Sequence, residues 1–136
     1  MPALAPDGPV LEVYYASTCA PCHAELGVLA AVERTGPDAL AAKLVVYLLT
    51  DEAIARREVA AASPALAARA IALPADTDQR SMLRAAGDAD GILPFARARD
   101  ANGRVCASWR GMLTLARIKA LLGACAISEP ARRPSG

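Results

Sequence analysis

Long hydrophobic runs are missing from this sequence, aromatic residues are few, and neither charge is in large excess. Its 136 residues are 54% hydrophobic, but alanine supplies much of that fraction. No stretch reaches the ~20 uninterrupted apolar residues that span a bilayer, so we expect no membrane insertion. The net charge is +1 and only 4% of the residues are aromatic. A chain without a basic block or aromatic stacking residues is not expected to bind nucleic acid.

The amino terminus also lacks a targeting signal. The first residues, MPALAPDGPVLEVYY, contain no basic segment followed by an apolar segment and a cleavage site. The protein is therefore either cytoplasmic or exported, with its signal removed. Four cysteines are an even number for so short a chain, which is typical of an oxidising compartment.

Two apolar segments predict the central strands of an α/β domain. Val10–Ala16 and Leu44–Thr50 are rich in β-branched and aromatic residues and are almost continuously apolar, as strands buried on both faces are. Leu26 and Leu29 have helical spacing between these strands, and Gly36-Pro37 is expected to end that helix. A strand, a helix and a strand in succession predict parallel pairing.

The remaining segments predict further helices and an antiparallel hairpin, which makes the sheet mixed. Asn102-Gly103 supplies the positive φ values that a tight hairpin turn needs. We place the domain at residues 10–125, between a flexible lead-in at 1–9 and a disordered tail at 126–136. The expected elements are helices after an Asp51 cap, from Ser63-Pro64 to about Ala72 and over Arg80–Ala86 with Asp78 as cap and Gly87 as end, strands at Pro94–Asp100 and Arg104–Arg110, and a helix from Thr114 to Gly123.

The segment STCAPCH, residues 17–23, carries the chemistry. Its two thiols lie where a buried strand meets a helix. Cys19 is expected beside unpaired backbone N–H groups and the positive end of the helix dipole, both of which stabilise a thiolate. Cys22 follows one turn later, close enough to attack a mixed disulfide. We therefore predict that Cys19 is the exposed nucleophile and Cys22 the shielded resolving thiol.

These residues resemble a known family. VLEVYYASTCAPCHAEL is similar to the strand–CxxC–helix unit of thioredoxin-like proteins, in particular of the exported TlpA/ResA-like disulfide reductases. GILPFARARDANGRV resembles the family's glycine–x–x–proline, strand, Asp/Asn-Gly turn and strand, so the resemblance covers roughly residues 8–123. It implies a thioredoxin fold and a thiol–disulfide oxidoreductase without a cofactor. The implied partners are protein thiols and disulfides and an upstream redox protein, in the periplasm or another exported location; a cytoplasmic location stays open.

The resemblance also implies which residues bind the substrate. Pro94 matches the cis-proline that faces the redox pair, and Leu93 before it would present its backbone to an extended substrate segment. Thr18 stands where thioredoxin-like proteins usually carry a tryptophan, immediately before the first cysteine. We therefore assign Thr18, Leu93 and Pro94 to substrate binding.

The proton acceptor for Cys22 is a departure from thioredoxin. Thioredoxin has a buried carboxylate in the preceding strand, where this chain has Val13. Glu12 is its neighbour but should point to the opposite face of the sheet. Glu25 is left as a weak substitute.

The CAPCH segment supports a second interpretation. It is also the attachment signature of a c-type haem, in which both cysteines bind the vinyl groups and His23 is an axial ligand. Met82 or Met112 would then have to supply the sixth ligand. Because small c-type cytochromes are mostly helical, strands on both sides of the motif favour thiol–disulfide exchange.

The other two cysteines leave three alternatives open. Cys106 is expected on the last strand and Cys125 just after the last helix, where they would be two small buried residues or a structural disulfide. A zinc site that uses all four cysteines is a third choice. Such a site usually has two closely spaced pairs of ligands, and this sequence lacks the second pair, so we predict no metal site. A thioredoxin-fold module that only binds a partner is a further alternative, but Cys19 and Cys22 are both present.

Overall fold

The strands form one mixed sheet in the order β3-β2-β1-β4-β5 in the computed structural model, which describes residues 9–35, 43–49, 52–74 and 78–132. Strand β1 is parallel to β2, β2 is parallel to β3, and β4 is antiparallel to both β1 and β5. The expected mixed sheet flanked by helices is therefore confirmed. The elements are β1 Val10–Tyr15, α1 Ala20–Thr35, β2 Lys43–Leu48, α2 Glu52–Ala62, α3 Pro64–Arg69, β3 Ile71–Ala72, α4 Gln79–Ala85, β4 Phe95–Arg99, β5 Val105–Arg110 and α5 Leu115–Arg132.

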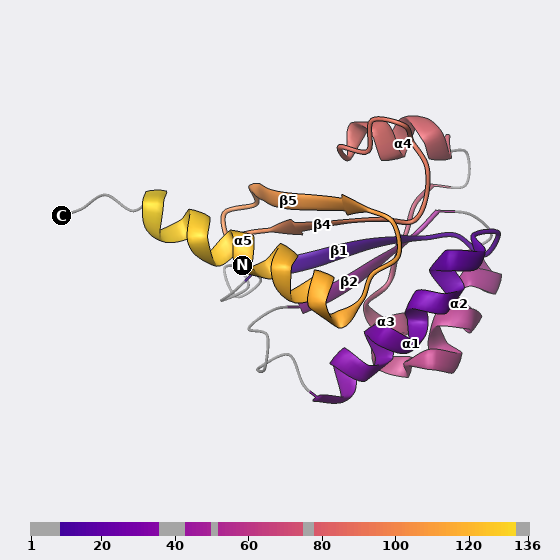
Figure 1. The fold of residues 1–136 in the computed structure, drawn as a ribbon. Helices are drawn as coiled ribbons and strands as arrows, with labels where there is room; N and C mark the ends of the chain where they lie inside the picture. The colour runs from indigo at the N-terminus through magenta and orange to yellow at the C-terminus, as the bar shows by residue number, and fades with distance from the viewer. Residues whose placement is uncertain (1–8, 36–42, 50–51, 75–77, 133–136) are drawn as a thin grey trace.

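The helices cover the two faces of this sheet unequally. Figure 1 shows α1, α2, α3 and α5 on one face and α4 on the other. Alternate residues of β1 point to the two sides, so Leu11, Val13 and Tyr15 pack in the larger core with the first group of helices. Tyr14 and Ala16 pack with Leu83 and Ala86 of α4 and its carboxyl end in a smaller core. This asymmetry leaves the end of β1 between both cores.

Side chains cap three of the helices, at Asp78 and Thr114 as expected, and also at Ser63, which was expected only to start a helix. The Ser63 side chain accepts a hydrogen bond from the Leu66 N–H, and Asp78 does the same for Ser81. The Thr114 hydroxyl accepts from the N–H of Arg117 at the start of α5. These side chains satisfy N–H groups that have no partner within the helix. The expected lead-in up to residue 8 and the expected cap at Asp51 lie outside the described residues.

Two expected helix ends are wrong. Helix α3 ends at Arg69 rather than near Ala72, because Ala70 has an extended backbone (ψ 143°) and Ile71 pairs with Tyr47 of β2. Helix α5 passes through Gly123 and continues to Arg132, into the segment we expected to be a disordered tail. Gly123 costs the helix about 1 kcal/mol relative to alanine, and the burial of apolar residues on both sides of it outweighs this cost.

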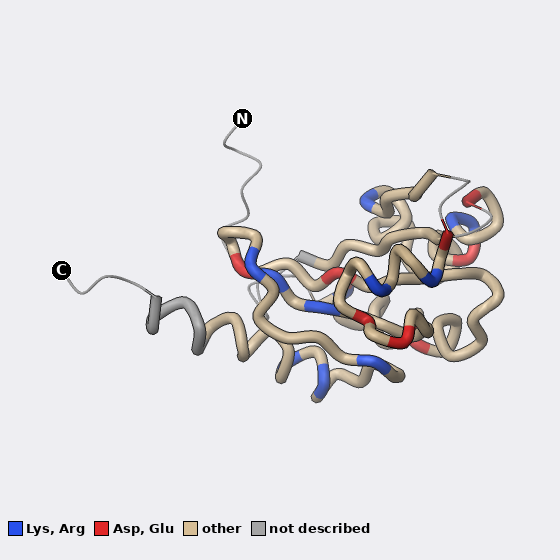
Figure 2. The backbone as a smooth tube through the Cα atoms, turned by 90° about the horizontal axis from the view of Figure 1, so that it is seen from above, with Lys and Arg blue, Asp and Glu red and all other residues tan. Residues whose placement is uncertain are grey.

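Acidic and basic residues are both spread over the fold (Figure 2). No helix in the described part of the chain is long and apolar enough to cross a membrane.

Candidate active site

The CxxC segment lies at the junction of β1 and α1. The Cys19 N–H donates to the Ala16 carbonyl (3.0 Å), which closes a turn directly after β1. The Cys19 carbonyl then accepts from Cys22 N–H (3.0 Å) and His23 N–H (3.2 Å), so Cys19 immediately precedes the first helical turn. The Cys22 N–H also points at the Cys19 sulfur, 3.2 Å away. The Cys19 sulfur therefore occupies the position at which a helix amino terminus stabilises negative charge.

The two sulfurs form a disulfide and differ in exposure. The Cα atoms of Cys19 and Cys22 are 5.2 Å apart, and Cys22 is buried with 1% of its surface exposed, whereas Cys19 is half-buried. Cys22 packs in the core with Leu26 and Leu29 of the same helix. An incoming sulfur can therefore reach Cys19 more easily than Cys22.

The segment that precedes β4 reaches the same end of the sheet. In the antiparallel register of β1 and β4, Tyr14 is opposite Phe95, which places Pro94 beside the last residue of β1. The Leu93–Pro94 peptide bond is cis, as the family resemblance implies. Leu93 and Cys19 each pack against both hydrophobic cores. Leu93 and Pro94 are distant from the CxxC segment in sequence, but the structure brings them to the end of the sheet that carries it.

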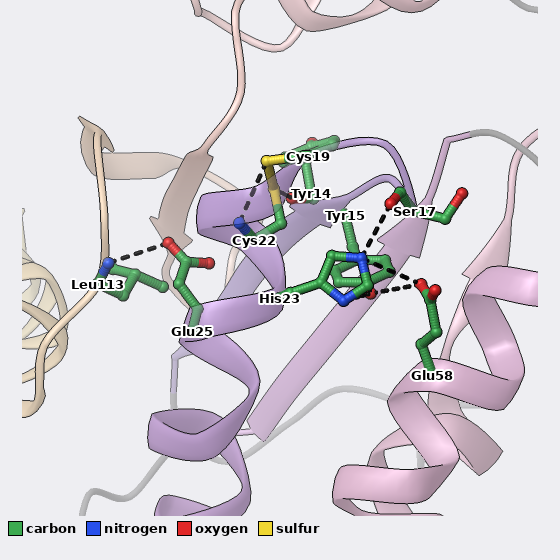
Figure 3. The surroundings of a disulfide bond; sticks show 9 residues. All are labelled: Tyr14, Tyr15, Ser17, Cys19, Cys22, His23, Glu25, Glu58 and Leu113. Carbon is green, nitrogen blue, oxygen red and sulfur yellow. Dashed lines mark hydrogen bonds and ion pairs between the residues drawn. A yellow bond between two sulfur atoms is a disulfide. The ribbon is translucent and has the colours of Figure 1, made fainter.

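Glu25 is a buried carboxyl one helical turn after Cys22. Only 2% of its surface is exposed, and its Oε2 accepts a hydrogen bond from the Leu113 N–H (2.9 Å). Burial raises the pKa of this carboxyl to about 7, and the Leu113 N–H acts against that rise. Figure 3 shows Glu25 on the side of α1 that faces Leu113, one turn along the helix from Cys22. From the sequence, Glu25 was only a weak substitute for the proton acceptor. Its burial depends on the segment around Leu113, which is distant in sequence, so no pattern near Glu25 predicts it.

His23 points to the other side of α1, toward α2 (Figure 3). Its Nε2 is 2.8 Å from the Ser17 carbonyl oxygen, which only accepts, so Nε2 carries a hydrogen. The same nitrogen is 3.5 Å from a carboxylate oxygen of Glu58, which also accepts from the Tyr15 hydroxyl (2.7 Å). Burial and the Glu58 hydrogen bond raise the pKa of Tyr15. These contacts join α1 and α2 to the turn that holds Thr18 and Cys19.

Glu12 lies on the opposite face from Val13, as expected, and does not belong to the CxxC site. It is buried and accepts hydrogen bonds from Tyr47 (3.0 Å), Arg97 (2.7 Å) and Arg99 (3.1 Å). A buried carboxylate with two guanidinium partners and a hydroxyl is fully paired, and it ties β1 to β2 and β4.

The second pair of cysteines is also joined. Cys106, near the start of β5, and Cys125 of α5 form a disulfide with Cα atoms 5.0 Å apart. Strand β5 runs in the same direction as β1, because each is antiparallel to β4. Cys106 therefore lies at the other end of the sheet from Cys19. In the described part of the chain, no three His, Cys, Asp or Glu side chains are grouped as a metal site would require.

Comparison with known proteins places this geometry in context. No family model and no curated protein sequence matches the chain, but solved structures do. A thioredoxin-related protein from Neisseria meningitidis serogroup B is 13% identical, with a TM-score of 0.67 over 90% of this chain and 87% of the other. A secreted Mycobacterium tuberculosis disulfide oxidoreductase homologous to E. coli DsbE is 16% identical (TM-score 0.63, 90% and 85% covered). StoA from Bacillus subtilis is 17% identical (TM-score 0.61, 83% and 81% covered). The chain therefore has the thioredoxin fold, as the resemblance implied.

Proposed function

We propose that this protein is a thiol–disulfide oxidoreductase that exchanges disulfides with protein substrates through Cys19 and Cys22. The observation that carries the proposal is the disulfide at the start of α1, with one half-buried sulfur at the helix amino terminus and one sulfur in the core. That asymmetry assigns different roles to the two thiols. The fold, which is shared with the secreted disulfide oxidoreductase above, supports the same chemistry.

In the reduced protein, the Cys19 thiolate attacks one sulfur of a substrate disulfide. The substrate S–S bond breaks, a Cys19–substrate bond forms, and the second substrate sulfur leaves as a thiolate that takes up a proton. Cys22 then loses its proton and attacks the Cys19 sulfur, which releases the first substrate sulfur. Two electrons have passed from the Cys19–Cys22 dithiol to the substrate, and the reverse sequence oxidises a substrate dithiol.

We assign Glu25 as the group that accepts the proton of Cys22. A carboxyl with a pKa of about 7 is half ionised near neutral pH, so it can both accept and return a proton. It lies one turn of α1 after Cys22, on the side of the helix opposite His23 (Figure 3). An acceptor is needed there because Cys22 is shielded from water by the core.

Thr18, Leu93 and Pro94 form the proposed substrate contact. Thr18 is exposed in the turn before Cys19, and the Leu93–Pro94 segment lies at the same end of the sheet. A substrate segment that pairs with the Leu93 backbone would align its own sulfur with Cys19.

We further propose an exported, oxidising location, with an upstream redox protein that restores the Cys19–Cys22 pair. Two disulfides in one small domain support such a compartment, since the cytosol keeps most thiols reduced. Measuring the reduction potential of the Cys19–Cys22 pair and comparing it with that of glutathione would give the direction of electron flow.

Turnover and thiol labelling test this function. The wild type should accelerate the dithiol-dependent reduction of a protein disulfide such as insulin, and Cys19→Ser should not. In the reduced protein, alkylation at mildly acidic pH should label Cys19 well before Cys22. The control is the Cys106→Ala/Cys125→Ala variant, which lacks the other disulfide and should retain turnover. Equal labelling of both thiols, or turnover by Cys19→Ser, contradicts the proposal.

A further inference from the structure

The loop between α4 and β4 contains a buried carboxylate that the proposed exchange reaction does not use. This loop runs through Asp88 and Gly91 to Leu93 and Pro94. Its backbone is fastened at several points: the Asp88 N–H donates to the Leu83 carbonyl (2.9 Å), and the Gly91 N–H donates to the Asp88 carbonyl (2.9 Å). The Gly111 N–H donates to the Pro94 carbonyl (3.0 Å), so the far end of the loop is tied to the end of β5.

The Asp88 side chain is turned inward and is 1% exposed. Its Oδ2 accepts a hydrogen bond from the Ile92 N–H (2.9 Å). Its Oδ1 is buried and has no hydrogen-bond partner in the described structure. The nearest cation is Arg110, whose Nη1 is 3.9 Å from this oxygen and which also pairs with Asp90. Arg110 is the last residue of β5 and directly precedes Gly111.

Stability of the fold does not by itself explain a charge at this position. A buried carboxylate oxygen without a hydrogen bond is unfavourable, and a neutral asparagine could accept the Ile92 N–H as well. The negative charge adds an attraction to Arg110, which joins the loop to β5 at a second point beside the Gly111–Pro94 hydrogen bond. The loop is therefore held by contacts with β5 and by the hydrogen bond between Asp88 and Ile92 within the loop.

We infer that Asp88 and Arg110 are a positioning pair that holds the segment from Ile92 to Pro94 ready for the substrate. The inference rests on the proposed function. Asp88 fixes the Ile92 N–H inward, one residue before the Leu93 backbone that would pair with the substrate. A loop held in its binding conformation loses less conformational entropy when the substrate binds, so the pair acts on substrate affinity and not on the sulfur chemistry.

Gly91 shows how little room the loop has. Its φ of +65° is left-handed, and a Cβ at this position would approach the Arg80 backbone carbonyl to 2.9 Å. The loop is thus packed against α4 on one side and held by Asp88 and Arg110 on the other. Because the loop is confined in this way, we expect a substitution at Asp88 to change the position of the Leu93 backbone.

The test compares a protein disulfide with a small disulfide as substrates. We expect Asp88→Asn and Arg110→Met each to raise KM for insulin by up to about fivefold, the effect of losing one partly exposed ion pair. The kcat for insulin and the rate constant with hydroxyethyl disulfide, which is too small to pair with the loop, should stay within about twofold of wild type. Arg110→Lys keeps the positive charge and should recover part of the loss.

Asp100→Asn is the matched control. Asp100 is also a buried aspartate that accepts backbone N–H groups in a loop, those of Asn102 (2.9 Å) and Arg104 (3.0 Å), but it lies at the opposite end of β4 from the CxxC site. This variant should leave KM unchanged. If Asp88→Asn does not fold, Arg110→Met decides the question, because its side chain is half exposed.

Two results separate the inference from the function it rests on. Unchanged KM in both variants, or an equal loss with the small disulfide, overturns the positioning pair while leaving the exchange function intact. A wild type that reduces neither substrate overturns the proposed function itself.

Discussion

Replacing Glu25 with glutamine is expected to make the protein more stable at alkaline pH and less active. Glutamine has nearly the same shape, has no charge at any pH, and its carbonyl can still accept the Leu113 N–H. The substitution therefore removes only the ionisation of a side chain that is 2% exposed. Any dependence of the difference on pH must come from that ionisation.

The magnitude follows from the pKa. The Glu25 carboxyl has an ordinary pKa of 4.5, and burial raises it to about 7 in the folded protein. Between these values the unfolded chain has released the proton, whereas the folded protein still holds it. Stability contributed by this group therefore falls as the pH rises through that interval and is constant above it. The full loss corresponds to about 3 kcal/mol, at roughly 1.4 kcal/mol for each pKa unit.

Urea unfolding of both proteins at about pH 4.5 and about pH 8 measures this difference. The two proteins should be equally stable at the lower pH, and Glu25→Gln should be more stable by up to about 3 kcal/mol at the higher pH. Glu52→Gln, which changes an exposed carboxyl on α2, is the control and should show no such divergence. A Glu25→Gln protein that is less stable at pH 8, or a difference that does not vary with pH, refutes the reasoning.

The same variant tests the catalytic role. If Glu25 accepts the Cys22 proton, Glu25→Gln should slow the release of a Cys19-bound substrate on the order of a hundredfold near neutral pH. The first step, attack by Cys19, should be unaffected. Single-turnover measurements with a labelled mixed disulfide separate the two steps, and equal release rates would remove Glu25 from the mechanism.

Two further predictions concern the cysteines. Cys22→Ser should accumulate substrates as mixed disulfides on Cys19, because the resolving thiol is gone; non-reducing gels should show the adducts, and undiminished turnover would argue against a two-cysteine mechanism. Removing the second disulfide with Cys106→Ala/Cys125→Ala should lower the free energy of unfolding by about 3 kcal/mol, the chain-entropy value for a sequence separation of 19, as measured in urea. A loss far below that value would indicate that α5 is held mainly by its packing.

The elements that the sequence predicts well are those with strong local signals. Val10–Ala16 and Leu44–Thr50 are close to the observed β1 and β2, since continuous β-branched and aromatic residues fit few alternatives. The cap at Asp78 and the turn at Asn102-Gly103 were found for the same reason: each depends on side chains or φ values within a few residues. Local chemistry is sufficient where the structure is local.

The errors and omissions involve contacts between distant segments. Strand β3 has two residues and exists because Ile71 finds a partner in Tyr47, which no pattern around Ile71 reveals. The same is true of the candidate site. A sequence pattern places Cys19 and Cys22 on a helix, but it does not show that Glu25 would be buried against a loop near residue 113 or that Asp88 would face Arg110.

The surroundings of CAPCH distinguish between the two interpretations of the motif. A c-type haem requires both sulfurs to be accessible to its vinyl groups and a histidine nitrogen free to bind iron. Here Cys22 is 1% exposed and packs among core residues, and His23 Nε2 donates to the Ser17 carbonyl beside Glu58. Haem attachment would have to open the core around Cys22 and break the His23–Ser17 hydrogen bond. Disulfide exchange needs only the half-buried Cys19 sulfur to be reached from outside, while Cys22 acts from within. The burial of Cys22 would therefore obstruct haem attachment, whereas disulfide exchange uses a buried resolving thiol.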